Sequence, residues 1–227
     1  MNITQLSQNI YQYETYFSPD ELSIKIRINT WLIRQNNDVY IIDTGISETA
    51  HNQIKIANMI GSPQAILLTH GHRDHVGGAK EWRKNLDIPI FAHENEFAYI
   101  DGEKSYLNRP ILDTGLAGVV QPISKIDNFH LPLKYYLTPG HSPGHIIFYH
   151  EPDNVLLVGD LFVTGENEIH PPLSDITTNM NENIRSASII DEIKPRIISS
   201  SHGYEIFYNN KLYEKYKFWY EKYNLSR

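Results

Sequence analysis

The chain of 227 residues contains no cysteine. This absence excludes disulfides, thiolate metal ligands and a cysteine nucleophile. Long apolar runs are also missing, since no stretch approaches the roughly 18 to 20 residues that a membrane-spanning helix needs. The first residues, Met1–Leu6, lack the basic start and the apolar core of a signal peptide. From these absences we expect a cytoplasmic protein without a membrane partner.

Positive charge is scarce as well. The sequence has 20 Lys and Arg against 27 Asp and Glu, which gives a net charge of −7. Nucleic-acid-binding surfaces normally carry a basic excess, so we expect no nucleic-acid partner. The hydrophobic and charged fractions, 41% and 21%, are those of an ordinary globular protein. The oligomeric state is left open by the composition.

The chain is rich instead in histidine at one place. The apolar run Ile66–Leu68 stops at Thr69, and the residues that follow include His70, His72, Asp74 and His75. Histidines this close would repel one another if protonated, and they would lack partners if buried and neutral. A divalent cation resolves both problems, because neutral imidazole and carboxylate are its usual ligands. We interpret the stretch as half of a metal site.

Hydrophobic patterning predicts an alternation of strands and helices. Strands are expected at about residues 11–16, 24–33, 39–42, 66–68, 89–92, 134–137, 146–149, 155–158 and 196–200. Helices are expected at about 48–60, 78–86, 182–193 and 211–223, the first capped by Ser47 and ended by Gly61. Segments 101–118 and 164–178 are irregular, and we treat the first as an inserted loop or lid. Each half of the chain therefore supplies strands for the inside and helices for the outside.

Polar groups follow five of the predicted strands. They are Asp43, the loop 70–75, His141, Asp160 and His202. Side chains on loops at the ends of buried strands are held by a rigid scaffold, as a functional site requires. Seven of these residues make a ligand set for two metal ions: His70, His72 and His141 for one, Asp74, His75 and His202 for the other, with Asp160 bridging both.

These positions carry a resemblance to a known family. The motifs are Asp43-Thr44-Gly45, His70-Gly71-His72-Arg73-Asp74-His75, Thr138-Pro139-Gly140-His141, Gly159-Asp160 and Ser201-His202-Gly203. In the order and identity of these motifs, the chain resembles the metallo-β-lactamase superfamily of metallohydrolases. The resemblance implies an α/β fold, an αβ/βα sandwich of two mixed β-sheets with helices on the outer faces, in a single domain over residues 1–227. It also implies two divalent metal ions, usually zinc, although iron or manganese would suit these nitrogen and oxygen ligands.

The resemblance also suggests roles for individual residues. A water bridging two ions about 3.5–4 Å apart becomes acidic enough to attack a carbonyl or phosphorus atom. Asp74 is the catalytic candidate, because it can bind metal and also orient the water or carry its proton. Asp43 is expected behind the ligands, holding a histidine N–H or the loop backbone. His145 is expected to be a buried supporting residue, and His93 a helix cap or a core residue.

The substrate is a small molecule in this interpretation, and the complete ligand set resembles the glyoxalase-II-like and lactonase-like branch. The 25 residues after His202 suffice for one helix but not for the glutathione-binding domain of glyoxalase II, and Val163 stands where similar lactonases have tyrosine. We predict hydrolysis of an ester, thioester or lactone. The alternatives are a phosphodiesterase, an iron-dependent sulfur dioxygenase, and a metal that merely clamps loops. Whether His170, Tyr99, Tyr106 or the segment 101–118 faces substrate stays open.

Overall fold

Seven strands form the first β-sheet, and they follow one another in chain order from β1 to β7. Their bounds are β1 Ile3–Gln5, β2 Ile10–Phe17, β3 Ile26–Gln35, β4 Asp38–Ile42, β5 Ser62–Leu67, β6 Ile90–Ala92 and β7 Gln121–Pro122. Strands β1 to β4 are antiparallel, whereas β4 to β7 are parallel, so the sheet is mixed. The parallel part directs the ends of β4 and β5 to the same edge, where Asp43 and the histidine loop follow.

Five strands form the second β-sheet, in the order β14-β13-β10-β9-β8. Their bounds are β8 Leu133–Leu137, β9 Ile146–His150, β10 Val155–Leu157, β13 Ile197–Ser199 and β14 Ile206–Phe207. Strands β10 and β13 are parallel, and the other pairs are antiparallel. A separate hairpin pairs β11 Val163–Gly165 with β12 Glu168–His170.

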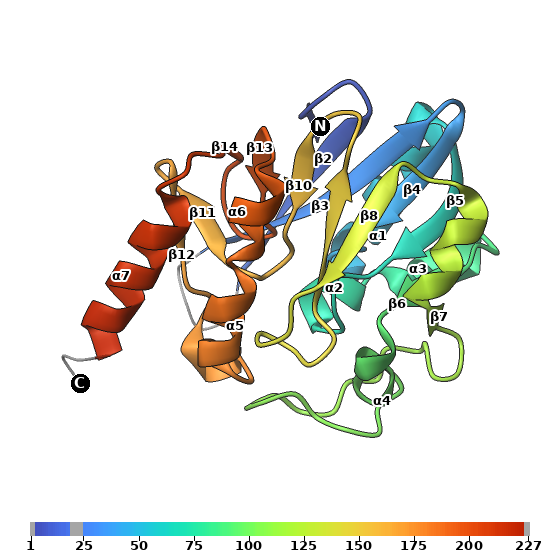
Figure 1. Cartoon of the computed structure of the whole chain (residues 1–227). Coiled ribbons are helices and arrows are strands. Elements are labelled where there is room, and N and C mark those ends of the chain that lie inside the picture. Colours follow the sequence, from blue (N-terminus) through green and yellow to red (C-terminus); the bar gives the residue numbers. More distant parts are fainter. Residues whose placement is uncertain (1–2, 19–24, 225–227) are drawn as a thin grey trace.

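The computed structural model describes residues 3–18 and 25–224, and in it the two sheets stack between outer helices (Figure 1). The longer helices are α1 Ser47–Ile60, α3 Ala79–Asn85, α5 Met180–Ser186, α6 Ile189–Ile193 and α7 Leu212–Asn224. Short helical turns are α2 Arg73–Val76, α4 Phe97–Ile100, and the 3-10 turns Glu94–Glu96, Ile123–Phe129 and Ser174–Ile176. This arrangement confirms the predicted αβ/βα sandwich.

Three apolar layers hold the sandwich together. The middle layer joins the facing sides of the two sheets, and its members include Trp31, Ile42 and Leu67 from the first sheet and Phe148 and Leu157 from the second. One outer layer packs α1 and α3 onto the first sheet, and the other packs α5, α6 and α7 onto the second. Because β4, β9, β10 and β13 are buried along nearly their whole length, these strands read as apolar runs rather than as clean alternation.

Some sequence expectations about the elements are wrong. Ser47 does not cap α1, because the N-cap is Ile46 and the Ser47 hydroxyl donates to the Glu48 carboxylate at 3.0 Å. The helix expected over 182–193 is two helices, α5 and α6, with Ala187 as the C-cap of the first. The segment 164–178 is not irregular throughout, since it contributes to the β11–β12 hairpin. The start of the strand predicted at 24–33 and the last residues of the chain lie outside the described residues.

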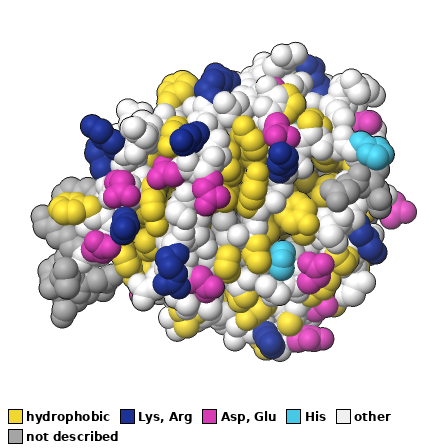
Figure 2. All heavy atoms as spheres, in the orientation of Figure 1, with side chains coloured by type: hydrophobic (Ala, Val, Ile, Leu, Met, Phe, Trp, Pro, Cys, Tyr) yellow, Lys and Arg dark blue, Asp and Glu magenta, His cyan; other side chains and the backbone are white. Residues whose placement is uncertain are grey.

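The surface mixes both signs of charge. On the face drawn in Figure 2, Lys and Arg side chains lie among Asp and Glu side chains, with apolar side chains between them. Within the described residues, none of the helices has the length and hydropathy that crossing a bilayer requires.

Candidate metal centre

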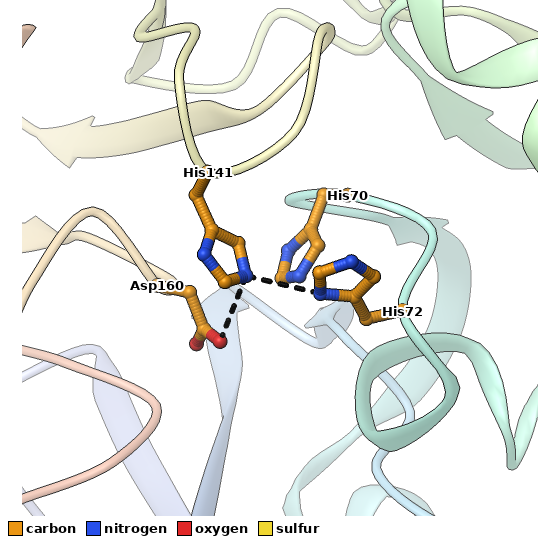
Figure 3. A group of neighbouring side chains, drawn as sticks. All are labelled: His70, His72, His141 and Asp160. Atoms are coloured by element: carbon orange, nitrogen blue, oxygen red, sulfur yellow. Dashed lines mark hydrogen bonds and ion pairs between the residues drawn. The ribbon is translucent and has the colours of Figure 1, made fainter. Parts of the chain in front are cut away.

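The loops that follow the strand ends bring the predicted ligands together at one edge of the sandwich. His70 and His72 follow β5, and His75 lies in α2. His141 lies between β8 and β9, Asp160 follows β10, and His202 follows β13. Figure 3 shows the side chains of His70, His72, His141 and Asp160 pointing toward one another from both halves of the chain. The two sheets therefore each contribute to one cluster.

Two groups of ligand atoms can be distinguished in this cluster. His70, His72, His141 and Asp160 form one, and Asp74, His75 and His202 form the other; in each, the candidate atoms lie within 4.8 Å of one another. Asp160 reaches both groups, since its Oδ2 is 3.3 Å from His141 Nε2 and 3.4 Å from His202 Nε2, and its Oδ1 is 3.3 Å from His75 Nε2. The two groups consist of the same residues that the sequence divided between two ions, and the role of each residue as a ligand stays a prediction.

Four buried atoms of the cluster form no hydrogen bond with the described residues: Nε2 of His70, His72 and His75, and Oδ1 of Asp160, although the last two atoms lie 3.3 Å apart. Buried polar atoms normally find a partner, and leaving one without costs about 1–3 kcal/mol. Imidazole nitrogens and carboxylate oxygens are the atoms that divalent transition metals bind. The residues present therefore fit a metal centre.

Protonation in the first group favours metal binding. Burial lowers the pKa of His70 and His72 well below the usual histidine value, and neighbouring imidazoles lower it further. Both rings are therefore neutral, which is the form that donates a lone pair to a metal.

The second group is more strongly charged. Burial opposes the charged form of His75 and His202, but the carboxylates around them, Asp160 foremost, outweigh it and raise the pKa of both rings. Burial would likewise raise the pKa of Asp74 and Asp160, yet the facing histidines outweigh it and lower the pKa of both carboxyls. The carboxylates are thus ionised, and positive charge is stabilised where they converge.

Asp43 lies behind the cluster, as predicted. Its Oδ2 is 2.8 Å from His75 Nδ1, and the Thr69 hydroxyl donates to the same oxygen at 2.7 Å. The Thr69 backbone N–H donates to Asp43 Oδ1 at 2.8 Å. Asp43 has φ 59°, a left-handed conformation that Asp tolerates better than most residues. One buried carboxylate therefore fixes the His75 ring and the end of β5 together.

His145 is a supporting residue rather than a member of either group. Its Nε2 accepts the Asp160 backbone N–H at 3.0 Å, and its Nδ1 is 2.9 Å from the Thr138 hydroxyl oxygen. Burial lowers the pKa of His145 to about 3, so the ring stays neutral and can accept that bond. The expectation that His145 is a buried supporting residue is confirmed, because its ring fixes the backbone at Asp160.

One side of the cluster is more exposed to solvent than the rest. The side chains of Asp74 and His202 are 28% and 21% exposed, whereas those of His75, His141 and Asp160 are at most 5% exposed. The cluster is therefore most accessible to solvent at Asp74 and His202. His170 is exposed on β12, with its Cα opposite Val163, and its contact with substrate stays a prediction. His93 caps the turn Glu94–Glu96 by accepting the Asn95 backbone N–H, as expected.

Sequence reasoning missed Glu96. This carboxylate is fully buried beside the loops of His70 and His141. Its neighbours His93, Glu94 and Asn95 are all polar and partly or fully exposed, so the stretch reads as a surface turn. No periodic pattern distinguishes Glu96 from Glu94. Tyr106, one of the two tyrosines that the sequence singles out, is buried, and the centroid of its ring is 4.4 Å from that of the His72 ring.

An αβ/βα sandwich with this strand order and with a cluster of His and Asp side chains at the edge of its sheets defines the metallo-β-lactamase class of metalloproteins. A model of that family, described as the metallo-beta-lactamase superfamily, matches residues 25–202. The chain therefore belongs to this superfamily, and it is a metal-dependent hydrolase with a His and Asp metal-binding cluster.

Known proteins similar to the chain agree with this assignment. A probable metallo-hydrolase of Bacillus subtilis, YybB, is 53% identical over 217 residues, which cover 95% of this chain and 97% of that protein. A hydroxyacylglutathione hydrolase of Klebsiella pneumoniae is 32% identical over 136 residues, which cover 60% of this chain and only 47% of that protein. The crystal structure of a metallo-β-lactamase from Erythrobacter litoralis superposes with a TM-score of 0.75, covering 97% of this chain and 96% of that one at 18% identity, and it shows the shared fold.

Proposed function

We propose that this hydrolase cleaves an ester, thioester or lactone of a small metabolite at a centre of two divalent metal ions, with zinc the first candidate and iron or manganese the alternatives. The observation that carries the proposal is the pair of ligand groups joined by Asp160, whose two oxygens face different histidines. A structural site for one metal ion would need only one group of ligands, with no carboxylate placed between two groups.

The seven residues divide the work of binding the ions. His70, His72 and His141 would hold one, Asp74, His75 and His202 the other, and Asp160 would be shared. When bound, two such ions supply the Lewis acidity that makes water a nucleophile near neutral pH and polarises the attacked oxygen.

Asp74 is suited to move a proton. Its Oδ2 lies 3.3 Å from His202 Nε2 and 3.8 Å from His75 Nε2, on the open side of the cluster. The neighbouring imidazoles keep the carboxylate ionised, so Oδ2 can accept the proton of the attacking water and return it to the leaving group. The exposed position lets substrate and water reach this oxygen.

An acyl substrate is favoured over the other reaction classes. Relatives named hydroxyacylglutathione hydrolase align over part of the chain, and that name describes cleavage of an acyl group from glutathione. The alignments cover only 47%, 63% and 48% of those relatives, so we do not propose glutathione as part of the substrate. Two ligand groups also argue against a dioxygenase with a single iron.

A substrate panel tests the proposal. Protein loaded in turn with zinc, iron and manganese is assayed on acyl esters, an acyl thioester, a γ-lactone and bis(p-nitrophenyl) phosphate. We expect turnover of at least one acyl substrate above that of the phosphate diester. Preference for the diester would favour the phosphodiesterase. Failure on every substrate with every metal would contradict a hydrolytic function of this class. The cytoplasmic location, the single domain and the absence of nucleic-acid and membrane partners stay predictions.

A further inference from the structure

Glu96 joins three parts of the chain that are far apart in sequence. Its Oε1 accepts the Ser142 hydroxyl at 2.7 Å and the Gly144 backbone N–H at 2.6 Å, both from the loop that carries His141. Its Oε2 accepts the Gly71 backbone N–H at 2.9 Å, from between His70 and His72. The same oxygen accepts the hydroxyl of Tyr106 in the segment 101–118. Both oxygens are therefore fully used inside the protein.

Two glycines make these contacts possible. A Cβ placed on Gly71 would come within 2.1 Å of the Tyr106 hydroxyl oxygen, and a Cβ on Gly144 would come within 2.8 Å of the Glu96 side chain. Gly71 stands inside the His70-Gly71-His72 motif, and Gly144 stands just before His145. The two metal-binding loops thus close around the Glu96 and Tyr106 side chains, with no space for larger residues.

Tyr106 connects this carboxylate to a ligand and to the segment 101–118. Its ring meets the His72 ring edge-on with centroids 4.4 Å apart, and it stacks on the Tyr99 ring at 4.5 Å. Burial, together with the nearby Glu96 charge, raises the pKa of Tyr106 well above its usual value, so the hydroxyl keeps the proton that it donates.

The segment 101–118 has a second attachment, to residues near Thr177, which contacts His141. Asn108 Nδ2 donates to the Asp175 carbonyl oxygen at 2.8 Å. Two residues further on, the Thr177 hydroxyl oxygen is 3.1 Å from His141 Nδ1. The segment therefore contacts His72 through Tyr106, and through Asn108 it contacts the stretch that includes Thr177, the partner of His141. His72 and His141 belong to the same group of candidate ligands.

We propose that Glu96 is a positioning residue that fixes the His70–His72 and His141 loops relative to each other, and that Tyr106 links the order of the segment 101–118 to metal binding. The inference rests on the proposed metal binding. Glu96 belongs to neither ligand group of the described residues, so it acts through the loops. Because linkage is reciprocal, metal bound at His70, His72 and His141 steadies the segment, and an ordered segment strengthens metal binding.

The substitution Glu96→Gln tests the carboxylate. Gln keeps the shape but replaces one oxygen with an NH₂ group, so either orientation turns a donor toward the Gly71 N–H or the Gly144 N–H. We expect the zinc affinity, measured by competition with a chromophoric chelator, to fall about 10- to 100-fold. The visible absorption of the cobalt-loaded protein should change, because it reports ligand geometry. Glu94→Gln is the matched control, since Glu94 lies on the same turn and is exposed.

The substitution Tyr106→Phe tests the link to the segment. Phe keeps the ring beside His72 and removes the hydroxyl, while Glu96 retains its three other donors. We expect the zinc affinity to fall less than tenfold. In hydrogen–deuterium exchange, zinc should protect amides 102–118 in the native protein and protect them much less in Tyr106→Phe.

The outcomes separate the two proposals. Equal zinc affinity and cobalt spectra for Glu96→Gln, Glu94→Gln and the native protein would overturn the positioning role alone, even with full hydrolytic function. Zinc-independent exchange of residues 102–118 in the native protein would overturn the link through Tyr106. If Glu96→Gln does not fold, the Tyr106→Phe exchange result still decides the link. If the native protein binds none of zinc, iron and manganese, both this inference and the proposed metal centre are overturned.

Discussion

Three imidazoles of the cluster, those of His75, His141 and His202, have an Nδ1 atom that contacts a group outside the cluster. His75 Nδ1 lies against the Asp43 carboxylate, and His202 Nδ1 donates to the Arg27 carbonyl oxygen at 2.7 Å. His141 Nδ1 is 3.1 Å from the Thr177 hydroxyl oxygen. A contact at one nitrogen fixes the tautomer and leaves the other nitrogen free for metal. The supporting residues therefore matter almost as much as the ligands.

Substitution of Asp43 tests this support. In Asp43→Asn the amide NH₂ replaces an oxygen that accepts bonds from His75 or Thr69, so the His75 ring loses its fixed direction. We expect zinc affinity to fall about 10- to 100-fold, measured by chelator competition. Asp38→Asn, at the opposite end of β4, is the control and should bind zinc like the native protein. Native affinity in Asp43→Asn would show that Asp43 supports only the backbone.

The proton-carrying role of Asp74 has its own test. Asp74→Asn removes the base at the open side of the cluster but keeps its size, so the fold should persist. We expect kcat on the best acyl substrate to fall about 10²- to 10⁴-fold with the circular dichroism spectrum unchanged. Metal content is measured on the same samples to separate proton transfer from metal loss. A variant with native kcat would contradict the assignment, whatever its metal content.

Contacts between turns connect the two sheets at the element scale. Asp153, in the turn between β9 and β10, accepts the Ser7 hydroxyl at 2.6 Å and the Asn9 backbone N–H at 2.8 Å. The Asn9 side chain donates to the other Asp153 oxygen at 2.9 Å. Ser7 and Asn9 belong to the turn between β1 and β2, so one carboxylate ties the first sheet to the second.

The pH dependence of stability should report this tie. Burial would raise the pKa of Asp153, but the hydrogen bonds from Ser7 and Asn9 outweigh it and lower the pKa below its ordinary 3.8. A lowered pKa stabilises the fold at pH above that ordinary value, and the stabilisation is lost as pH falls through the folded pKa. We expect Asp153→Asn to reduce the free energy of unfolding by about 1–3 kcal/mol at pH 7, measured in urea, and by less below pH ~4.

The exposed Asp87 provides the control for that measurement. Asp87→Asn should leave the free energy of unfolding within about 0.5 kcal/mol of the native value at every pH. A deficit of Asp153→Asn that stays constant down to the lowest pH would mean that the lost contact is not that of the carboxylate.

Elements with long apolar runs could be predicted from the sequence, and short ones could not. The run Val39–Ile42 and the helix from 48 to 60 carry enough pattern to be found. Strands β7 and β14 have two residues each, so they carry no period and exist only because a neighbouring strand pairs with them. The loop 70–75 could be singled out because His and Asp are rarely so dense, whereas His141, Asp160 and His202 could be singled out only by their order in the family motifs. Glu96 could not be singled out, because three of its four partners come from loops 25 to 48 positions away and the fourth, Tyr106, is 10 positions away in an irregular segment.

At the scale of the whole molecule, the site depends on the stacking of the two sheets. Trp31 Nε1 donates to the Ser199 hydroxyl at 2.9 Å, and that hydroxyl donates to Gln12 Oε1 at 2.7 Å. Asn29 on β3 donates to the Ser200 and Gly203 carbonyl oxygens at 2.9 and 2.8 Å, on either side of His202. These contacts attach the loop that carries His202, which follows a strand of the second sheet, to the first sheet. They explain how candidate ligands from the two sheets come together.

Metal binding across that junction should also stabilise the fold as a whole, because a ligand that binds only the native state raises its unfolding free energy. The most direct test of a dinuclear hydrolytic centre is a titration of metal-depleted protein with whichever of zinc, iron and manganese gives the highest activity, in which hydrolysis of the best acyl substrate is measured at each addition. We expect activity to rise up to two metal ions per chain and then to level off. Activity that levels off at one ion per chain, or no acyl hydrolysis at full loading with any of the three metals, would contradict a dinuclear hydrolase.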